Sequence, residues 1–415
     1  MSAHSASPHH KAEYPSFPFT RLHGVDPAPE NAELRRKCPV SQVQLFDGSK
    51  AWLVTKHKDC RQVLESQDFS ADRRKDGYPE IHAGGKVAAL ASAPTFVNLD
   101  DPEHEAQRNR TQAAFTPSAI AQLRPLIQSI VDSSLDHLIS LGCANGPIDL
   151  IHNFIAPIPT KTVYHILGVP EEDIETLAYD SEVRNSTSRN AAENANTNLQ
   201  SYMAELTEKK IQNPGNDLIS ELISQYHSGT GTKPDISNLA YLTLVAGNAA
   251  VINSIALGVL TLHQHPSQLE ELKNDPSLAP KVVDEIFRYQ TASALNCRRV
   301  ARRDVEVGGV KIPKGSGVIC AVQAADRDEE FPQPSSSSDP ETFDIHRGHD
   351  LKDVLGFGWG IHRCQAEWLS KAELEIVFAT LYQRLPNLKV AVSPEELKYT
   401  PPTQNIGIAE LPVTW

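Results

Sequence analysis

The residues with the clearest chemical potential lie near the C-terminus of the chain. Phe357-Gly358-Trp359-Gly360-Ile361-His362-Arg363-Cys364 is a glycine-rich loop that ends on a cysteine, and apolar periodicity predicts a helix over Gln365 to Leu385. The N–H groups and dipole of a first helical turn, together with His362 and Arg363, favour a thiolate. The pattern predicts that Cys364 is a soft metal ligand or a nucleophile. The simpler interpretation is a buried thiol after a flexible loop.

Two further groups of charged residues have helical spacing. Glu285 and Arg288 share one helix face, and Asp101-Pro102-Glu103-His104 is followed by Arg108. Alone, the first would be an ordinary surface pair worth about 0.2–0.5 kcal/mol. Neither group indicates a function without the other.

These residues need a scaffold, and its centre is predicted at Leu239 to Leu262. This segment carries no charge over a length that could span a bilayer. Asn248, Asn253 and Ser254 lie in its middle, and the rest of the chain is amphipathic. We therefore expect a long helix that is buried on all sides, rather than a membrane span.

The remaining elements are predicted mainly as helices between Pro and Gly residues. Predicted helices are Lys58–Ser66, Pro117–Gly142, Asp149–Leu167, Glu171–Asn185, Asn190–Gln212, Pro266–Asn274 and Leu278–Tyr289. Strands are expected over Gln42–Thr55, around an Asp-Gly turn, and over Val305–Ile319, and an irregular meander over Pro332–Asp353. This order predicts a mainly α protein with small β-sheets, in the α+β class.

Composition restricts the function classes. The 415 residues include 39 Lys+Arg and 52 Asp+Glu, which gives a net charge of -13 and disfavours nucleic-acid binding. Six scattered cysteines without a CxxC pair indicate a reducing compartment. Without a repeat or a linker, we expect a single domain over 1–415, with residues 1–35 partly flexible. We also expect a monomer that is cytoplasmic, with a mitochondrial fraction left open.

Taken in order, the HxxxR group, the charge-free helix, the ExxR group and the cysteine loop make the chain resemble the cytochrome P450 (haem-thiolate) superfamily over nearly its full length. The resemblance implies haem b held between the central helix and the cysteine loop, with Cys364 as the axial ligand of the iron. It implies cationic donors to the haem propionates at His104, Arg108, Arg299 and His362. It also implies a salt-bridge triad of Glu285, Arg288 and Arg347. Ala366 stands where most members have glycine, which affects only the packing of helix against haem.

The central helix departs from the oxygen-activating members of this superfamily. Those members usually carry an acid–alcohol pair, because O–O cleavage requires two protons. In Ala246-Gly247-Asn248-Ala249-Ala250, Asn248 does not titrate and Ala250 has no hydroxyl. Either a water or another residue substitutes, as in some hydroxylases, or the protein breaks no O–O bond.

The second alternative corresponds to the fungal nitric oxide reductase branch, which the chain resembles beyond the haem motifs. The similar segments are Pro39–Asp59, Gly142–Pro147, Leu244–Ala250, Thr291–Leu295, Arg327–Glu330 and Lys371–Leu374. The resemblance implies denitrification chemistry, in which two NO are reduced to N2O with electrons taken directly from NADH or NADPH. It implies no redox partner protein.

The resemblance also implies roles for distal residues. Gly247, Asn248 and Ala250 would leave room for a nicotinamide over the haem, and Ser293 would carry protons through bound water. Ser293 is equally interpretable as a strand serine bonded to backbone. Asn405 stands where the branch has an aspartate in its proton path, so this residue cannot pass a net proton.

A dinucleotide with phosphates needs cations, and the chain has no GxGxxG after a strand. Arg73-Arg74-Lys75, close before Gly84, is the most conspicuous basic cluster and resembles the cofactor entrance of the branch. Without the resemblance it would be a solvated patch. Asn98 stands where the branch has an acidic partner for this cluster. The choice between NADH and NADPH stays open.

Two other functions remain compatible with the same motifs. One is a conventional monooxygenase of a small organic substrate, which receives electrons from a ferredoxin or a reductase. The other is a non-catalytic haem protein that binds NO, with Ala250 and Asn405 marking lost turnover.

Overall fold

The computed structural model describes residues 14–91, 93–183, 189–331 and 339–415. The longer helices are α1 (Pro29–Lys37), α2 (His57–Glu65), α3 (Gly85–Ala91), α4 (Glu103–Arg108), α5 (Pro117–Leu141), α6 (Pro157–Leu167), α7 (Ile174–Val183), α8 (Arg189–Gln212), α9 (Leu218–His227), α10 (Lys233–Ala246), α11 (Asn248–Gln264), α12 (Pro266–Asn274), α13 (Ala279–Gln290), α14 (Val322–Ala325) and α15 (Glu367–Arg384). The strands are β1 (Val40–Gln44), β2 (Lys50–Val54), β3 (Phe69–Ser70), β4 (Ile148–Asp149), β5 (Arg298–Ala301), β6 (Val305–Val307), β7 (Val310–Ile312), β8 (Gly317–Cys320), β9 (Lys389–Val390) and β10 (Pro412–Thr414).

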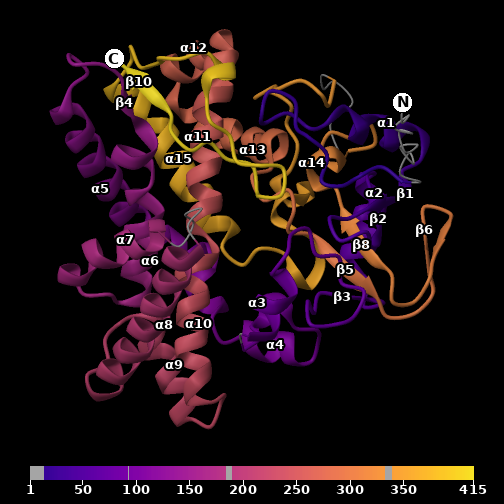
Figure 1. Ribbon diagram of the computed structural model, residues 1–415. Coiled ribbons are helices and arrows are strands. Elements are labelled where there is room, and N and C mark those ends of the chain that lie inside the picture. The colour runs from indigo at the N-terminus through magenta and orange to yellow at the C-terminus, as the bar shows by residue number, and fades with distance from the viewer. Residues whose placement is uncertain (1–13, 92, 184–188, 332–338) are drawn as a thin grey trace, which may run out of the picture.

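Helices and strands occupy different sides of the molecule (Figure 1). Helices α5 to α13 and α15 build one side around the largest hydrophobic cluster. The other side holds a five-stranded sheet in the order β1-β2-β8-β5-β3, with smaller clusters against it. The predicted α+β class is therefore confirmed, with α10 and α11 forming a column through the helical side (Figure 1).

The predicted strands are confirmed, but they serve different sheets. β1 and β2 pair antiparallel around the turn at Asp47-Gly48, with Val43 opposite Ala51. Of the segment predicted over Val305–Ile319, β6 and β7 form a separate hairpin, whereas β8 runs parallel to β2. The period-2 pattern locates strands, but the choice of sheet depends on long-range pairing.

The prediction for the central helix was wrong in two respects. The column is two helices, α10 and α11, which meet at Gly247. α11 is buried along most of its length, whereas α10 buries only Ile236, Leu239, Ala240 and Leu244. Ala246 and Ala249 are exposed beside the junction. Burial on all sides fails because one face of this junction is left uncovered.

By length and hydropathy, Lys233–Gln264 would also pass as a membrane span, because its most apolar 18 residues have a mean hydropathy of 1.7. Half of its most apolar stretch is buried inside the protein, which is the behaviour of a core helix. Gly258 shows how tightly α11 packs. A Cβ there would lie 2.6 Å from Phe378 and 2.7 Å from Ile286, on α15 and α13.

The other predicted helices are found with small shifts of their ends. The segment Asp149–Leu167 is divided into a π-helical turn over Ile151–Ile155 and α6, and residues 184–188 lie outside the described residues. Of the N-terminal segment expected to be partly flexible, residues 1–13 also lie outside. From Tyr14 on it packs against the protein, with Phe17 and Phe19 buried under the sheet.

Candidate functional site

The cysteine loop is fixed by hydrogen bonds along its own backbone. The N–H of Cys364 donates to the carbonyl of Phe357 at 2.7 Å. Arg363 donates to the carbonyls of Val354, Gly358 and Leu351 at 3.1–3.2 Å. At Gly360 a Cβ would lie 2.7 Å from the carbonyl oxygen of Leu64, so only glycine permits this contact. The loop therefore presents Cys364 in one defined position.

Cys364 itself differs from the sequence prediction. α15 begins at Glu367, so a turn of two residues separates the cysteine from the helix that was expected to follow directly. The thiol has accessible surface, yet burial raises its pKa, against a hydrogen bond from the N–H of Ala366. An accessible thiol and a pKa raised by burial are consistent with each other if the thiol faces an internal space. Burial thus opposes the thiolate that the sequence predicts, whereas a bound metal cation would favour it.

The side chains predicted to hold propionates come together from three segments. His104 and Arg108 lie on α4, Arg299 on β5, and His362 in the cysteine loop. The rings of His104 and His362 are 4.5 Å apart. Burial, together with the positive charges of Arg299, His104 and Arg108, lowers the pKa of His362 to about 3. His362 is thus a neutral donor rather than the predicted cation.

This group fits a dicarboxylate cofactor. Nε2 of His104 is buried without a hydrogen-bond partner among the described residues, while its Nδ1 lies 2.9 Å from Asp101. The Arg299 guanidinium donates a hydrogen bond to the backbone carbonyl of Arg298 at 2.9 Å. Burial also lowers the pKa of Arg108. Buried or half-buried donors whose hydrogen-bonding capacity the described residues leave unused, His104 Nε2 and the guanidinium groups of Arg108 and Arg299, are the partners that two haem propionates require.

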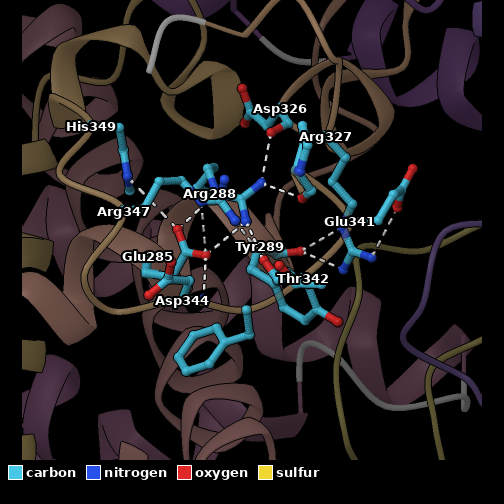
Figure 2. Close-up of polar contacts among 12 residues, drawn as sticks. Glu285, Arg288, Tyr289, Asp326, Arg327, Glu341, Thr342, Asp344, Arg347 and His349 are labelled. Atoms are coloured by element: carbon cyan, nitrogen blue, oxygen red, sulfur yellow. Dashed lines mark hydrogen bonds and ion pairs between the residues drawn. The ribbon is translucent and has the colours of Figure 1, made fainter. Parts of the chain in front are cut away.

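The predicted salt-bridge triad is confirmed, and Figure 2 shows its contacts. Arg288 donates to both carboxylate oxygens of Glu285 at 2.7 Å, and Arg347 lies 3.3 Å from the same carboxylate. Other guanidinium N–H groups bind carbonyls of the predicted meander, those of Pro340 and Thr342 among them. Of that meander, residues 332–338 lie outside the described residues, and Glu285 and Arg288 fasten the part from residue 339 onward to α13.

The distal side is built from small and amide residues. A Cβ on Gly247 would meet nothing within 4 Å, and Ala250 is half-buried. Asn248 is buried, and its Oδ1 has no partner among the described residues. The structure leaves open space and an unused acceptor where α10 meets α11.

Ser293 lies in a turn rather than in the strand that the simpler interpretation requires. The side chain is half-buried, and no described residue bonds its Oγ. The preceding carbonyl of Ala292 accepts the N–H of Ile406 at 2.9 Å, so this turn adjoins the loop of Asn405. Asn405 Oδ1 is buried without a described partner. Asn253 of α11, which the sequence analysis did not select, packs against Gly407 of the same loop.

The basic cluster is already neutralised by carboxylates. Arg73 pairs with Glu80 at 2.9 Å, Arg74 with Asp72 at 2.8 Å, and Lys75 with Asp100 at 3.0 Å. The absent acid at Asn98 is therefore replaced by three others that sequence inspection did not connect. Gly84 adopts φ +90° and faces open space, which only glycine does without strain.

A buried acid beside the cysteine loop was also missed. Asp326, at the end of α14, is fully buried and accepts the N–H groups of Leu355 and Gly356 at 2.8 and 3.0 Å. Its sequence signal was weak, because Asp326 is the first of five consecutive charged residues, Asp326 to Glu330, and only the fold shows that it is buried.

Comparisons with known proteins agree with this geometry. The family model for Cytochrome P450 matches residues 166–413. Cytochrome P450 55A3 of Fusarium lichenicola is 46% identical over 405 residues, which cover 97% of each chain. Vitamin D3 dihydroxylase of Streptomyces griseolus is 34% identical, also over 97% of each. The crystal structure of cytochrome P450 MoxA from Nonomuraea recticatena, 35% identical, matches with a TM-score of 0.90 over 96% of this chain and 98% of that one.

Family membership implies haem iron and oxidoreductase chemistry, and the fungal relative supports the branch that the sequence resembles. The loop of Cys364, the propionate donors and the Glu285 triad are arranged as a haem-thiolate site requires. The chain therefore belongs to the cytochrome P450 family.

Proposed function

We propose that this chain is a haem-thiolate nitric oxide reductase. Two NO, one NADH or NADPH and one proton give N2O, water and the oxidised dinucleotide, without a redox partner protein. The observation that carries the proposal is the junction of α10 and α11, where Asn248 and Ala250 replace an acid–alcohol pair beside open space. Bound haem would supply the iron that binds NO and accepts electrons.

The distal residues make room for the nicotinamide. A Cβ added to Gly247 would have no neighbour within 4 Å, so no side chain closes the space next to this Cα, where we place the nicotinamide. The free Oδ1 of Asn248 is an acceptor at the same junction, suited to the N–H2 of a carboxamide. Binding and orientation of the donor are thus the work of α11.

The proton in this reaction is delivered by hydroxyls and water. The Oγ of Ser293 has no described partner, so it can both accept from and donate to a bound water. The amide of Asn405 can orient such a water, but it cannot release a proton. We therefore propose a relay that depends on Ser293 and water more than on the C-terminal loop.

The dinucleotide enters past Arg73, Arg74 and Lys75 in this proposal. Because each cation already has a carboxylate partner, phosphates must exchange with Glu80, Asp72 or Asp100. The pairs of Arg74 and Lys75 are more than a third exposed on the cation side, so this exchange costs little. The proposal also includes a cytoplasmic monomer, without a membrane or a nucleic acid as partner.

A partner-dependent monooxygenase is the alternative that a specific observation favours. Vitamin D3 dihydroxylase and Pentalenic acid synthase are bacterial relatives at 34% identity over nearly the whole chain. Ile361 and Trp368, which flank Cys364, are 39% and 44% exposed, as a docking face for an electron donor would require.

The deciding experiment uses ferric holoprotein under anaerobic conditions. NO is added first, then NADH or NADPH, and the haem spectrum and headspace N2O are followed without any reductase. We expect the spectrum of the NO complex to decay with N2O release, at rates that rank the two dinucleotides. Cys364→Ser should abolish this activity, whereas Cys38→Ser, at an exposed cysteine, should retain it.

The other outcomes separate the alternatives. An NO complex that persists until ferredoxin and its reductase are added would contradict direct electron transfer and indicate the monooxygenase. An NO complex that persists even then would indicate a non-catalytic NO-binding protein.

A further inference from the structure

The carboxylate of Asp326 is attached to the cysteine loop from outside it. Asp326 follows α14 and has no accessible surface. Its Oδ1 accepts the N–H of Leu355 at 2.8 Å, and its Oδ2 accepts the N–H of Gly356 at 3.0 Å. Each carboxylate oxygen thus holds one of two successive backbone N–H groups.

This contact reaches Cys364 through a single turn of backbone. Leu355 and Gly356 begin the short 3₁₀ turn that ends at Phe357. The carbonyl of Phe357 accepts the N–H of Cys364 at 2.7 Å. A displacement of this turn would therefore displace the backbone at Cys364, because Phe357 belongs to the turn and its carbonyl is hydrogen-bonded to the N–H of Cys364.

The two N–H donors match a side chain with two acceptor oxygens. An asparagine has one acceptor oxygen and would direct its N–H2 at the other N–H donor. The Thr291 hydroxyl, 3.5 Å from Oδ2, is a third donor to the same carboxylate. An ionised carboxylate accepts from all of these groups with no proton of its own to place, so it binds them more strongly than the protonated acid does.

The surroundings bring this ionisation into an accessible pH range. Burial raises the pKa of Asp326 to about 8, against the two N–H donors and the positive charges of Arg288 and Arg363. Arg288 donates to the Asp326 backbone carbonyl at 2.9 Å. The thiols of Cys60 and Cys297 face the same carboxylate, and burial raises the pKa of both.

We propose that Asp326 is a positioning residue for the axial cysteine. By accepting the N–H groups of Leu355 and Gly356 with both oxygens, it fixes the loop that presents Cys364 to haem iron. The proposal rests on Cys364 as the haem ligand, which family membership implies, and it is independent of the nitric oxide reductase function.

The test compares two isosteric substitutions in one segment. Asp326→Asn removes one of the two acceptors under the cysteine loop. Asp328→Asn is the matched control, because Asp328 is equally buried and also binds backbone N–H groups, those of His57 and Glu330, but none in the cysteine loop. Both variants are purified as holoprotein beside the wild type.

Two measurements report on ligation without any turnover. The carbon monoxide difference spectrum of the reduced protein distinguishes thiolate-bound from thiol-bound haem, and is recorded across the pH range around 8. Hydrogen exchange followed by mass spectrometry reports on peptides that cover residues 351–364. In the wild type we expect the thiolate form to decrease as pH falls through about 8, when Asp326 takes up a proton.

For Asp326→Asn we expect a lower thiolate fraction that no longer changes over this pH range, and about tenfold faster exchange in the loop. Asp328→Asn should keep the wild-type profile. Equal spectra and equal loop exchange in all three proteins would overturn the proposal. If Asp326→Asn does not fold, the pH profiles of the wild type and of Asp328→Asn test the proposal instead. A thiolate fraction that stays constant through this pH range in both proteins overturns the proposal.

Discussion

Two regions of this molecule use the same arginine–carboxylate chemistry for opposite purposes. In the triad, the side chains of Glu285, Arg288 and Arg347 are at most 1% exposed. In the basic cluster, Arg74 is 38% exposed and its partner Asp72 is 12% exposed. The triad is sealed in protein, whereas the cluster can exchange its partners with a ligand.

The difference teaches that burial, not distance, decides what an ion pair does. The Arg288–Glu285 contact of 2.7 Å and the Arg74–Asp72 contact of 2.8 Å are nearly equal in length. In the interior, removing one partner leaves an uncompensated charge, but near the surface water replaces it. The triad therefore fixes the local structure, whereas the ion pairs of the basic cluster can exchange their partners, as the proposed dinucleotide entrance requires.

The largest expected effect follows removal of the triad carboxylate. Glu285→Gln leaves Arg288 and Arg347 buried without their counter-charge, so we expect a loss of about 3–5 kcal/mol in the free energy of unfolding. Urea unfolding of the holoprotein measures it. Glu271→Gln, in an exposed pair with His346, is the control and should cost less than about 1 kcal/mol. Equal losses in the two variants would contradict the role of burial.

A buried carboxyl without a cation sharpens the comparison. Glu373 on α15 is 1% exposed, its Oε1 has no described partner, and burial raises its pKa from 4.5 to about 8 despite a hydrogen bond from Thr162. Between these values the unfolded chain releases a proton that the folded protein keeps, so the free energy of unfolding falls as pH rises.

In Glu373→Gln the side chain stays neutral at every pH, so this decrease in the free energy of unfolding does not occur. We expect its stability relative to the wild type to improve by about 1–3 kcal/mol between about pH 6 and about pH 9. Urea unfolding at both pH values measures the change. Glu375→Gln, whose carboxylate pairs with Arg124 at 2.9 Å, should show no such gain. A gap between Glu373→Gln and the wild type that does not vary with pH would refute the prediction.

The smallest effect is expected at the basic cluster. Asp72→Asn releases Arg74 and should change the free energy of unfolding by less than about 1 kcal/mol. It should also lower the KM for the dinucleotide about two- to fivefold, by removing a competitor for phosphate, and added salt should reduce the difference. Steady-state kinetics measure both. Asp68→Asn, in the exposed pair with Arg303, is the control, and an equal KM in the two variants would count against the entrance.

Local pattern was a good guide to the elements and to the ligand. Helical and strand periodicity located most helices and the β1–β2 hairpin, because each depends on neighbours in sequence. Cys364 stood out because its loop carries glycines and a helix behind it. The division of the central helix at Gly247 was not predicted, because one glycine in an apolar segment does not distinguish one continuous helix from two.

Outside the predicted triad of Glu285, Arg288 and Arg347, the electrostatic partners could not be predicted. Arg74 and Asp72 are close in sequence. The ion pair of Lys75 with Asp100 and the hydrogen bond from Leu355 to Asp326, by contrast, join residues that only the fold brings together. The neutral state of His362 likewise follows from burial beside Arg299 and His104. A sequence gives the type of each charged residue, but the partner and the pKa of that residue depend on its surroundings in the fold.

By itself, the sequence determined the family and the class of fold and predicted Cys364 as the haem ligand, because these depend on motif order and short-range periodicity. The tertiary structure decided which charges are sealed and which are exchangeable, that the central helix breaks at Gly247, and that Asp326 holds the cysteine loop. The physical reason is that burial and long-range contacts set the strength of each electrostatic interaction, and neither is a local property of the chain.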